Sequence, residues 1–230
     1  MIRAVFLDID NTLLSFSGYV KQAMREGFAA FGLPEYREEM YPVFQRVNDG
    51  LWQQIEQGTL TFERLQEIRW NLIFEQLGIR FDGPTFETYF REKLFDSAVP
   101  EPGAGELLAY LRERYVLCAA SNGPYGQQLN RLRIAGFYDA FRYFFISEKI
   151  GASKPGADFF DACFDTLRAE ALPGLKAEET MMIGDSVSAE ISGAKQYGMA
   201  ACLYTGGRAV GQTGGADYAV SRLEEIRAFL

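Results

Sequence analysis

The chain has 230 residues, of which 48% are hydrophobic and 23% charged, a composition typical of a globular protein rather than a disordered one. Its formal net charge of −8 argues against a binding surface for nucleic acid polymers or acidic membranes, because both require clustered positive charge. The sequence contains no histidine, which excludes histidine-based triads and histidine metal sites. Acid–base or metal chemistry would therefore have to use carboxylates.

The three cysteines, Cys118, Cys163 and Cys202, lie in apolar segments without metal-ligand spacing, which predicts buried free thiols in a reducing compartment. The first residues lack the basic-then-apolar plan of a signal peptide. No apolar run approaches the roughly 18 residues that a transmembrane helix needs. We therefore expect a cytoplasmic protein without a membrane segment.

The first predicted strand begins at Ala4 and runs directly into two aspartates, Asp8 and Asp10. Its near-continuous apolar residues indicate a strand buried on both faces, as in a parallel sheet. The aspartates would lie at its carboxyl end, which is the edge where open α/β sheets bind ligands. Two adjacent carboxylates cannot both stay ionised without a cation or a shared proton. The structural alternative is a polar turn that caps the strand.

Between Ser17 and Asp96 the apolar residues recur at helical spacing, as in Val20, Met24 and Phe28. Breaker and capping signals divide the segment into four amphipathic helices, at residues 32–34, 58–59 and 82–84. No strand-like alternation is present, so we predict an all-helical insertion.

After Pro100 helices alternate with strands, which is typical of a parallel sheet with helices on both faces. The glycine-rich residues 206–215 predict a surface loop rather than a dinucleotide site, and residues 221–226 a terminal helix with a capping box. The strands expected after the first one cover residues 115–120, 143–146, 180–183 and 200–204.

The predicted fold class is therefore α/β. A Rossmann-like parallel sheet with helices on both faces would form a core from residues 1–16 and 97–230, and residues 17–96 would form an inserted helical domain.

Three later strands also run into polar residues, and the carboxyl ends of parallel strands share one edge of a sheet. Singly, these groups are compatible with a turn, a solvated lysine and a helix N-cap. Together they supply what phosphoryl transfer needs, namely a carboxylate nucleophile, oxygen ligands for a divalent metal and donors around a phosphate. The groups are Ser121-Asn122-Gly123, Lys154-Pro155 and Gly184-Asp185-Ser186.

These segments, with Asp8-Ile9-Asp10-Asn11-Thr12, resemble in the same order the four motifs of the haloacid dehalogenase superfamily of phosphatases. The resemblance covers the whole chain, because that superfamily's first cap type is a helical insertion between the first and second motifs. The presence of Asp10 favours phosphoryl transfer over carbon–halogen cleavage, since dehalogenase members lack an aspartate at that position. A phosphonatase would need a cap lysine, and only Lys21 and Lys93 lie in the cap region.

By resemblance, Asp8 is the nucleophile that forms an aspartyl-phosphate, and Asp10 is the general acid and then the general base. Ser121 and Lys154 would bind phosphate oxygens, with Asn122 beside them.

The resemblance also implies a bound Mg²⁺ ion. Asp185, the Asp8 side chain and the Asp10 backbone carbonyl would hold it, in agreement with the preference of Mg²⁺ for hard oxygen ligands. The fourth motif often carries a second acidic residue, usually aspartate. The nearest candidate here is Glu190, one methylene longer, and we leave it outside the predicted ligand set.

Residues 47–52, 58–61 and 65–66 further resemble the pyrimidine 5′-nucleotidase branch. The predicted function is a Mg²⁺-dependent nucleoside 5′-monophosphatase, acting on a small phosphomonoester as a monomer or homodimer. Trp52, Phe16 or Tyr19 could stack on a base, or Trp52 could belong to the core of the helical domain. The alternatives are a small sugar-phosphate phosphatase or phosphomutase, and a non-catalytic phosphate-binding module.

Overall fold

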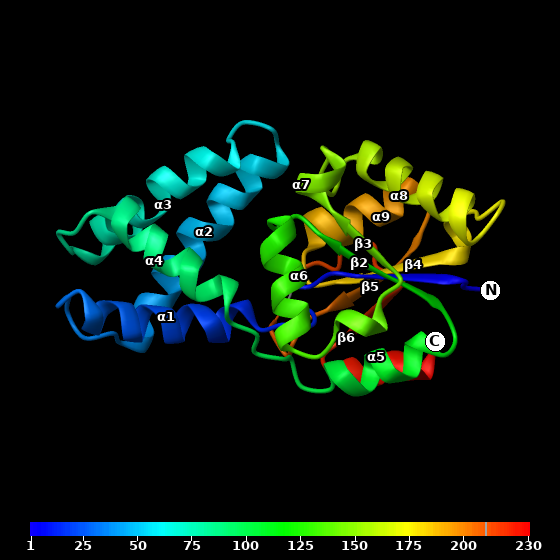
Figure 1. Cartoon of the computed structure of the whole chain (residues 1–230), viewed down its shortest axis with the longest axis horizontal. Helices are drawn as coiled ribbons and strands as arrows, with labels where there is room; N and C mark the ends of the chain where they lie inside the picture. Colours follow the sequence, from blue (N-terminus) through cyan, green and yellow to red (C-terminus); the bar gives the residue numbers. More distant parts are fainter. Residues whose placement is uncertain (210) are drawn as a thin grey trace. The chain divides into compact units, whose positions relative to one another are not determined.

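The computed structural model describes residues 1–209 and 211–230. It divides the chain into two compact units, which we call the core unit and the helical unit (Figure 1). The core unit contains Met1–Ser15 and Ala98–Leu230, and the helical unit contains Phe16–Ser97.

The core unit is built on a six-stranded parallel sheet with the order β3-β2-β1-β4-β5-β6. Strand β1 lies at its centre, where Leu7 pairs with Ala119 on one side and Ile183 on the other. The α/β fold class and the parallel sheet are confirmed, and β6 is an addition, since its three residues are too short for a periodic signal. The strands are β1 (Ala4–Leu7), β2 (Val116–Ser121), β3 (Tyr143–Ile146), β4 (Thr180–Gly184), β5 (Ala200–Tyr204) and β6 (Tyr218–Val220).

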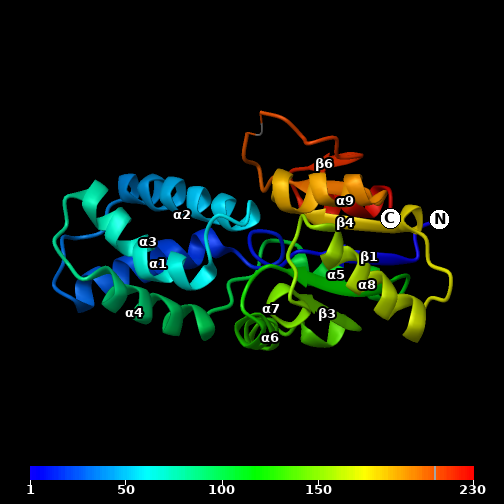
Figure 2. The ribbon, with the colours of Figure 1, turned by 90° about the horizontal axis from the view of Figure 1, so that it is seen from above.

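Both faces of this sheet are covered by helices (Figures 1 and 2). The side chains of Val5 and Leu7 belong to one apolar cluster, and those of Ala4 and Phe6 belong to another on the opposite face. All four are fully buried, which explains why the strand carries no polar alternation. The helices are α5 (Ala104–Arg112), α6 (Tyr125–Ile134), α7 (Ser147–Ile150), α8 (Ala157–Glu170) and α9 (Gly193–Tyr197).

Shorter helical turns complete the core unit. A π-helical turn, η4 (Val187–Ser192), precedes α9, so the helix that the alternating pattern predicts between β4 and β5 is divided in two. The predicted terminal helix is the 3₁₀ segment η5 (Leu223–Ala228). The other two 3₁₀ turns are η2 (Tyr138–Ala140) and η3 (Ala177–Glu179). The described part of the predicted loop over 206–215 contains no helix or strand, and residue 210 lies outside the described residues.

The helical unit contains α1 (Phe16–Ala30), η1 (Glu38–Met40), α2 (Tyr41–Glu56), α3 (Phe62–Leu77) and α4 (Gly83–Phe95). As the sequence predicts, it is all-helical. Thr61 and Asp82 cap the start of α3 and α4 by accepting main-chain N–H bonds, and Gly78 ends α3 in the left-handed conformation at φ 67°. The caps and the apolar stripe together define these helices.

The interior of the helical unit also holds a buried ion pair. Arg69 binds Glu87 with two nitrogens, at 2.6 Å from Nη2 to Oε1 and 3.1 Å from Nε to Oε2. Its remaining Nη1 donates to Asn48 Oδ1 at 3.1 Å. Both charged side chains are only 5% exposed. The pair is therefore bidentate, balanced in charge and closed within the unit.

No helix in the described residues is both long enough and apolar enough to span a membrane.

Candidate active site

The polar residues predicted at the strand ends meet at one edge of the sheet. Asp8 directly follows β1, and its N–H donates to Ile183 O at 2.9 Å, which aligns it with the end of β4. Ser121 ends β2 and Asp185 follows β4, while Lys154 lies in the segment between α7 and α8. The parallel register thus brings groups from distant parts of the sequence together, as expected for this sheet edge.

The turn after β1 places Asp10 and depends on Asn11. Asn11 has a φ of 56°, a left-handed conformation that asparagine tolerates better than most side chains. Its N–H donates to Leu14 O at 2.7 Å, while the N–H groups of Leu13 and Leu14 both donate to Ile9 O. The chain therefore reverses tightly beyond the second aspartate.

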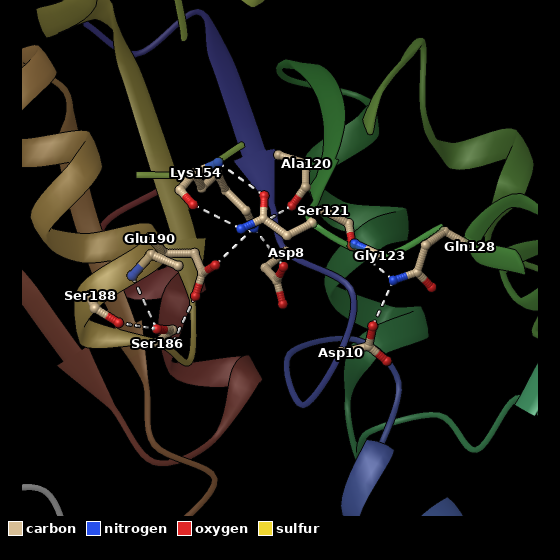
Figure 3. A network of polar contacts seen from close by, with 12 residues as sticks. Asp8, Asp10, Ala120, Ser121, Gly123, Gln128, Lys154, Ser186, Ser188 and Glu190 are labelled. Atoms are coloured by element: carbon tan, nitrogen blue, oxygen red, sulfur yellow. Dashed lines mark hydrogen bonds and ion pairs between the residues drawn. The ribbon is translucent and has the colours of Figure 1, made fainter. Parts of the chain in front are cut away.

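Lys154 is buried at the centre of the site, with its side chain 1% exposed (Figure 3). Its ammonium group lies 2.7 Å from Asp8 Oδ1, 2.7 Å from the Ala120 carbonyl oxygen and 2.8 Å from Glu190 Oε1. Three acceptors match the three hydrogens of the ammonium group. Burial by itself lowers the Lys154 pKa, but the charges of Asp8 and Glu190 outweigh burial and raise it above its ordinary value.

Asn122 holds the main chain of Lys154 in place. Its Nδ2 donates to Lys154 O at 2.8 Å, and its Oδ1 accepts from Lys154 N at 2.9 Å. The amide therefore joins the end of β2 to the lysine segment, and this pair of bonds orients the buried ammonium.

Three carboxylates form a candidate metal centre. One oxygen from each of Asp8, Asp185 and Glu190 lies within 4.8 Å of the others. Glu190 therefore belongs to this candidate metal centre, although it lies outside the ligand set predicted from the sequence. The signal for Glu190 in the sequence is its short distance along the chain from Gly184-Asp185. The π-helical turn η4 brings its side chain, one methylene longer than that of aspartate, back to the end of β4.

Two neighbours fix the position of Glu190. Its Oε2 accepts from Ser186 N at 2.8 Å. Gly184 supplies the space, since a Cβ there would lie 2.3 Å from Glu190 Cγ, far inside van der Waals contact. The glycine of the Gly-Asp-Ser segment is therefore required by the packing of Glu190.

The electrostatics of the cluster suit a divalent cation. Burial raises the pKa of Asp8 to about 7 and the pKa of Asp185 to about 7, and the repulsion between the carboxylates adds to both shifts. Burial also raises the pKa of Glu190. Arg208 provides partial compensation at 3.0 Å from Asp185 Oδ2. Hard oxygen ligands with excess negative charge fit Mg²⁺.

Asp10 faces helix α6 rather than the carboxylate cluster (Figure 3). Arg131 Nη1 lies 2.6 Å from Asp10 Oδ1, and Gln128 Nε2 lies 2.6 Å from Asp10 Oδ2. Gln128 also donates to Ser121 Oγ at 2.8 Å. The alternation of helices and strands predicts a helix here, but nothing in the sequence marks Gln128 or Arg131 as site residues, because polar residues on a helix are usually solvated.

The aromatic residues considered for base stacking differ in exposure. Tyr19 is 3% exposed, and its hydroxyl donates to the Phe90 carbonyl oxygen. Trp52 is partly buried against Phe62, with ring centroids 5.6 Å apart. Phe16 is partly buried against the apolar core of the helical unit. Packing thus involves all three, and base stacking stays a prediction.

Residues 2–198 match the haloacid dehalogenase-like hydrolase family, a span that includes every strand-end residue described above. The chain belongs to this family.

Two curated relatives cover most of the chain. The HAD-hydrolase YfnB of Bacillus subtilis is 30% identical over 200 residues, which are 87% of this chain and 83% of the relative. The pyrimidine 5′-nucleotidase PynA of Streptococcus pneumoniae is 29% identical over 206 residues, covering 88% and 83%. The crystal structure of magnesium-bound YfnB has a TM-score of 0.89 and 28% identity, with coverage of 100% and 98%.

A third relative has a different named substrate. The glyceraldehyde 3-phosphate phosphatase of Methanothermobacter thermautotrophicus is 27% identical over 207 residues, covering 88% of this chain and 85% of the relative. Its similarity is close to that of the nucleotidase, so family membership by itself leaves the substrate open.

Proposed function

We propose that this member of the hydrolase family is a Mg²⁺-dependent phosphomonoester hydrolase that works through an aspartyl-phosphate. The observation that carries the proposal is the buried contact of Lys154 with Asp8 at the sheet edge, beside Asp185 and Glu190. Metal-assisted phosphoryl transfer requires a carboxylate nucleophile, a fixed positive charge beside it and further carboxylates that bind the metal ion, and this site supplies all three.

In the first step a carboxylate oxygen of Asp8 attacks the phosphorus, and the bond from phosphorus to the leaving oxygen breaks. Asp10 donates a proton to that oxygen, so the product leaves as an alcohol. Lys154 and the hydroxyl of Ser121 bind phosphate oxygens and offset their charge. We assign the contact predicted for Asn122 to its main-chain N–H, because its side chain is bonded to Lys154.

In the second step water attacks the phosphorus of the aspartyl-phosphate. Asp10 now accepts the proton of the water, and the bond between phosphorus and Asp8 breaks. Inorganic phosphate leaves, and the Asp8 carboxylate is restored. One residue can serve both steps because the proton that it donates in the first is regained in the second.

Mg²⁺ bound by Asp8, Asp185 and the Asp10 carbonyl, with Glu190 alongside, would neutralise charge on the phosphate and let nucleophile and substrate approach each other. The described residues fit this ion, since the cluster offers carboxylate oxygens and no nitrogen or sulfur ligand.

The substrate that we propose is a nucleoside 5′-monophosphate, supported by the similarity to PynA over 88% of the chain. A small sugar or triose phosphate is the second candidate, favoured by the similarity to the glyceraldehyde 3-phosphate phosphatase. The complete set of Asp8, Asp10, Lys154 and Asp185 argues against a silent phosphate-binding module.

The decisive test is hydrolysis of p-nitrophenyl phosphate with and without Mg²⁺. We expect metal-dependent turnover by the wild type and none by Asp8→Asn. Asp139→Asn removes an exposed acidic charge elsewhere in the core unit and is the matched control. Turnover by the wild type no greater than that of Asp8→Asn would overturn the proposed enzyme.

The substrate is tested with a panel of nucleoside monophosphates and sugar phosphates compared by kcat/KM. We expect the highest values for a pyrimidine nucleoside 5′-monophosphate. Equal or higher values for hexose or triose phosphates would remove the nucleotidase assignment and leave the phosphatase intact.

A further inference from the structure

Helix α6 provides one donor for each carboxylate oxygen of Asp10. Arg131 Nη1 lies 2.6 Å from Oδ1, and Gln128 Nε2 lies 2.6 Å from Oδ2. Gln128 and Arg131 are three residues apart and therefore lie on the same face of the helix. Gln128 is fully buried and Arg131 is 1% exposed, whereas the Asp10 side chain is 31% exposed. The donors are thus built into the core, and the carboxylate that they hold lies at its edge.

The amide of Gln128 connects Asp10 with Ser121. Besides its bond to Asp10, Nε2 donates to Ser121 Oγ at 2.8 Å (Figure 3). Its Oε1 accepts from Arg131 Nη1 at 3.0 Å. Both amide hydrogens are therefore used, and their directions are fixed by two acceptors. The proposed acid–base residue and the proposed phosphate-binding hydroxyl are joined through one buried side chain.

The contacts of Ser121 determine where its hydroxyl hydrogen can go. Its Oγ accepts from Gly123 N at 3.0 Å and from Gln128 Nε2 at 2.8 Å. A serine hydroxyl has two acceptor lone pairs and one hydrogen. Because both lone pairs are occupied, the hydrogen is left to donate, which is what an anionic phosphate oxygen requires.

Gly123 makes this arrangement sterically possible. A Cβ at this position would lie 2.4 Å from Gln128 Nε2 and 2.9 Å from its Cδ. Any other residue would therefore push the amide away from Ser121 and Asp10. The glycine of the Ser-Asn-Gly segment has a packing role in the site in addition to its role in the turn.

We propose that Gln128 and Arg131 are positioning residues for phosphoryl transfer, an inference that rests on the proposed function. They orient the Asp10 carboxyl for proton transfer, and Gln128 also directs the Ser121 hydroxyl toward the phosphate. When Asp10 gives its proton to the leaving oxygen, the Arg131 guanidinium stabilises the carboxylate that is formed. The structural alternative is that the two side chains only fasten α6 to the turn after β1.

The dependence of kcat/KM on the leaving group distinguishes a positioning role of Gln128 and Arg131 from a purely structural one. Benzyl phosphate releases an alcohol that needs a proton, whereas p-nitrophenyl phosphate, of similar size, releases a stable anion that needs none. Since kcat/KM reports the steps up to the first irreversible one, it isolates formation of the aspartyl-phosphate. The variants are Arg131→Met and Gln128→Met. Arg133→Met and Gln127→Met, on the same helix, are the matched controls.

We expect Arg131→Met to lower kcat/KM about 100-fold for benzyl phosphate, a loss typical of impaired general acid catalysis. For p-nitrophenyl phosphate we expect a loss of less than about 10-fold, because its leaving group needs no proton. Arg131→Lys, which keeps a cation, should recover part of the loss on benzyl phosphate. Gln128→Met should in addition weaken binding of inorganic phosphate, measured by calorimetry, because the Ser121 hydroxyl loses its orientation. Both controls should behave like the wild type.

Equal losses on the two substrates, or no loss, in variants whose circular dichroism is native would overturn the positioning role. Gln128→Met and Arg131→Lys provide the same comparison if Arg131→Met does not fold. An inactive wild type would instead overturn the proposed function itself, so the two failures are distinguishable.

Discussion

Each unit of this chain contains a buried cluster of charged side chains, and the two clusters are built differently. In the helical unit, Arg69 and Glu87 form one bidentate pair that Asn48 completes. In the core unit, the single ammonium group of Lys154 lies among carboxylates, with Asp8 at 2.7 Å and Glu190 at 2.8 Å. Both clusters lose hydration on folding, but only the first restores the balance of charge.

The difference separates a structural cluster from a functional one. A closed pair offers no unused charge to a ligand, so its removal should change only folding. A cluster with excess carboxylate is costly by itself, which is why burial and repulsion raise the pKa values of Asp8 and Asp185 to about 7. Such a site becomes favourable when a cation binds.

The largest expected effect is on catalysis in the core unit. Asp8→Asn should lower kcat by roughly 10⁴-fold or more, because it removes the nucleophile. Thermal unfolding without metal should occur at an unchanged or higher temperature, since one buried negative charge is lost. Activity and scanning calorimetry on the same preparation check both, with Asp139→Asn as control. A strongly destabilised Asp8→Asn variant would contradict the comparison.

The largest effect on folding should come from the helical unit. Glu87→Gln leaves the Arg69 guanidinium buried without its counter-charge and should lower the free energy of unfolding by about 3–5 kcal/mol. Glu92→Gln, at an exposed position of the same helix, should have little effect.

Urea denaturation measures the free energy of unfolding of Glu87→Gln and of its control Glu92→Gln. The double substitution Arg69→Met with Glu87→Leu should recover most of the loss, because it removes both charges together. A double variant no more stable than Glu87→Gln would show that the closed pair contributes more than charge balance.

Metal should stabilise only through the core cluster. Mg²⁺ at about 100 times its Kd should raise the free energy of unfolding by about 2.7 kcal/mol. Asp185→Asn should abolish the accompanying shift in Tm, whereas Glu87→Gln should keep it despite a lower starting Tm. Thermal melts with and without Mg²⁺ provide the measurement. A full shift in Asp185→Asn would place the ion elsewhere.

The smallest effects should come from two glycines. Gly184→Ala should weaken Mg²⁺ affinity about 10-fold, a change of about 1.4 kcal/mol, because the new Cβ displaces Glu190. Gly50→Ala in α2 meets nothing within 4 Å and should stabilise the helical unit by about 0.5–1 kcal/mol. Calorimetry measures the first and urea denaturation the second. Unchanged affinity in Gly184→Ala would remove Glu190 from the site.

Much of the fold was predictable because local patterns are strong in both units. The apolar run of β1 and the helical spacing of α1 are visible in the sequence, and the breakers at residues 58–59 and 82–84 act locally. Strand β6 was missed because three residues carry too little periodicity. The π-helical turn η4 was missed because apolar spacing does not distinguish it from an α-helix.

Asp8, Ser121 and Asp185 were predicted because each lies at the end of a recognisable strand, whereas Lys154, beyond α7, was predicted from its place in the order of the four motifs. Gln128 and Arg131 were not predicted, because they lie on a helix, where polar residues are normally solvated. Glu190 was named as the nearest acidic residue of the fourth motif but left outside the ligand set, because its side chain is one methylene longer than that of aspartate. The burial of Glu190 depends on space left by Gly184, and that of Gln128 on space left by Gly123, which is a property of packing between elements.

The sequence by itself determined the α/β class, the all-helical insertion and the order of the polar strand ends, since these follow from spacing along the chain. Only the tertiary structure decided which charges are balanced and which are in excess. It joined Asp10 to Ser121 through α6, and it brought Glu190 to the carboxylate cluster. These outcomes depend on distances between residues far apart in the chain. Moreover, the side chains lose their hydration only on folding, and it is this loss that makes an unbalanced charge costly and shifts its pKa.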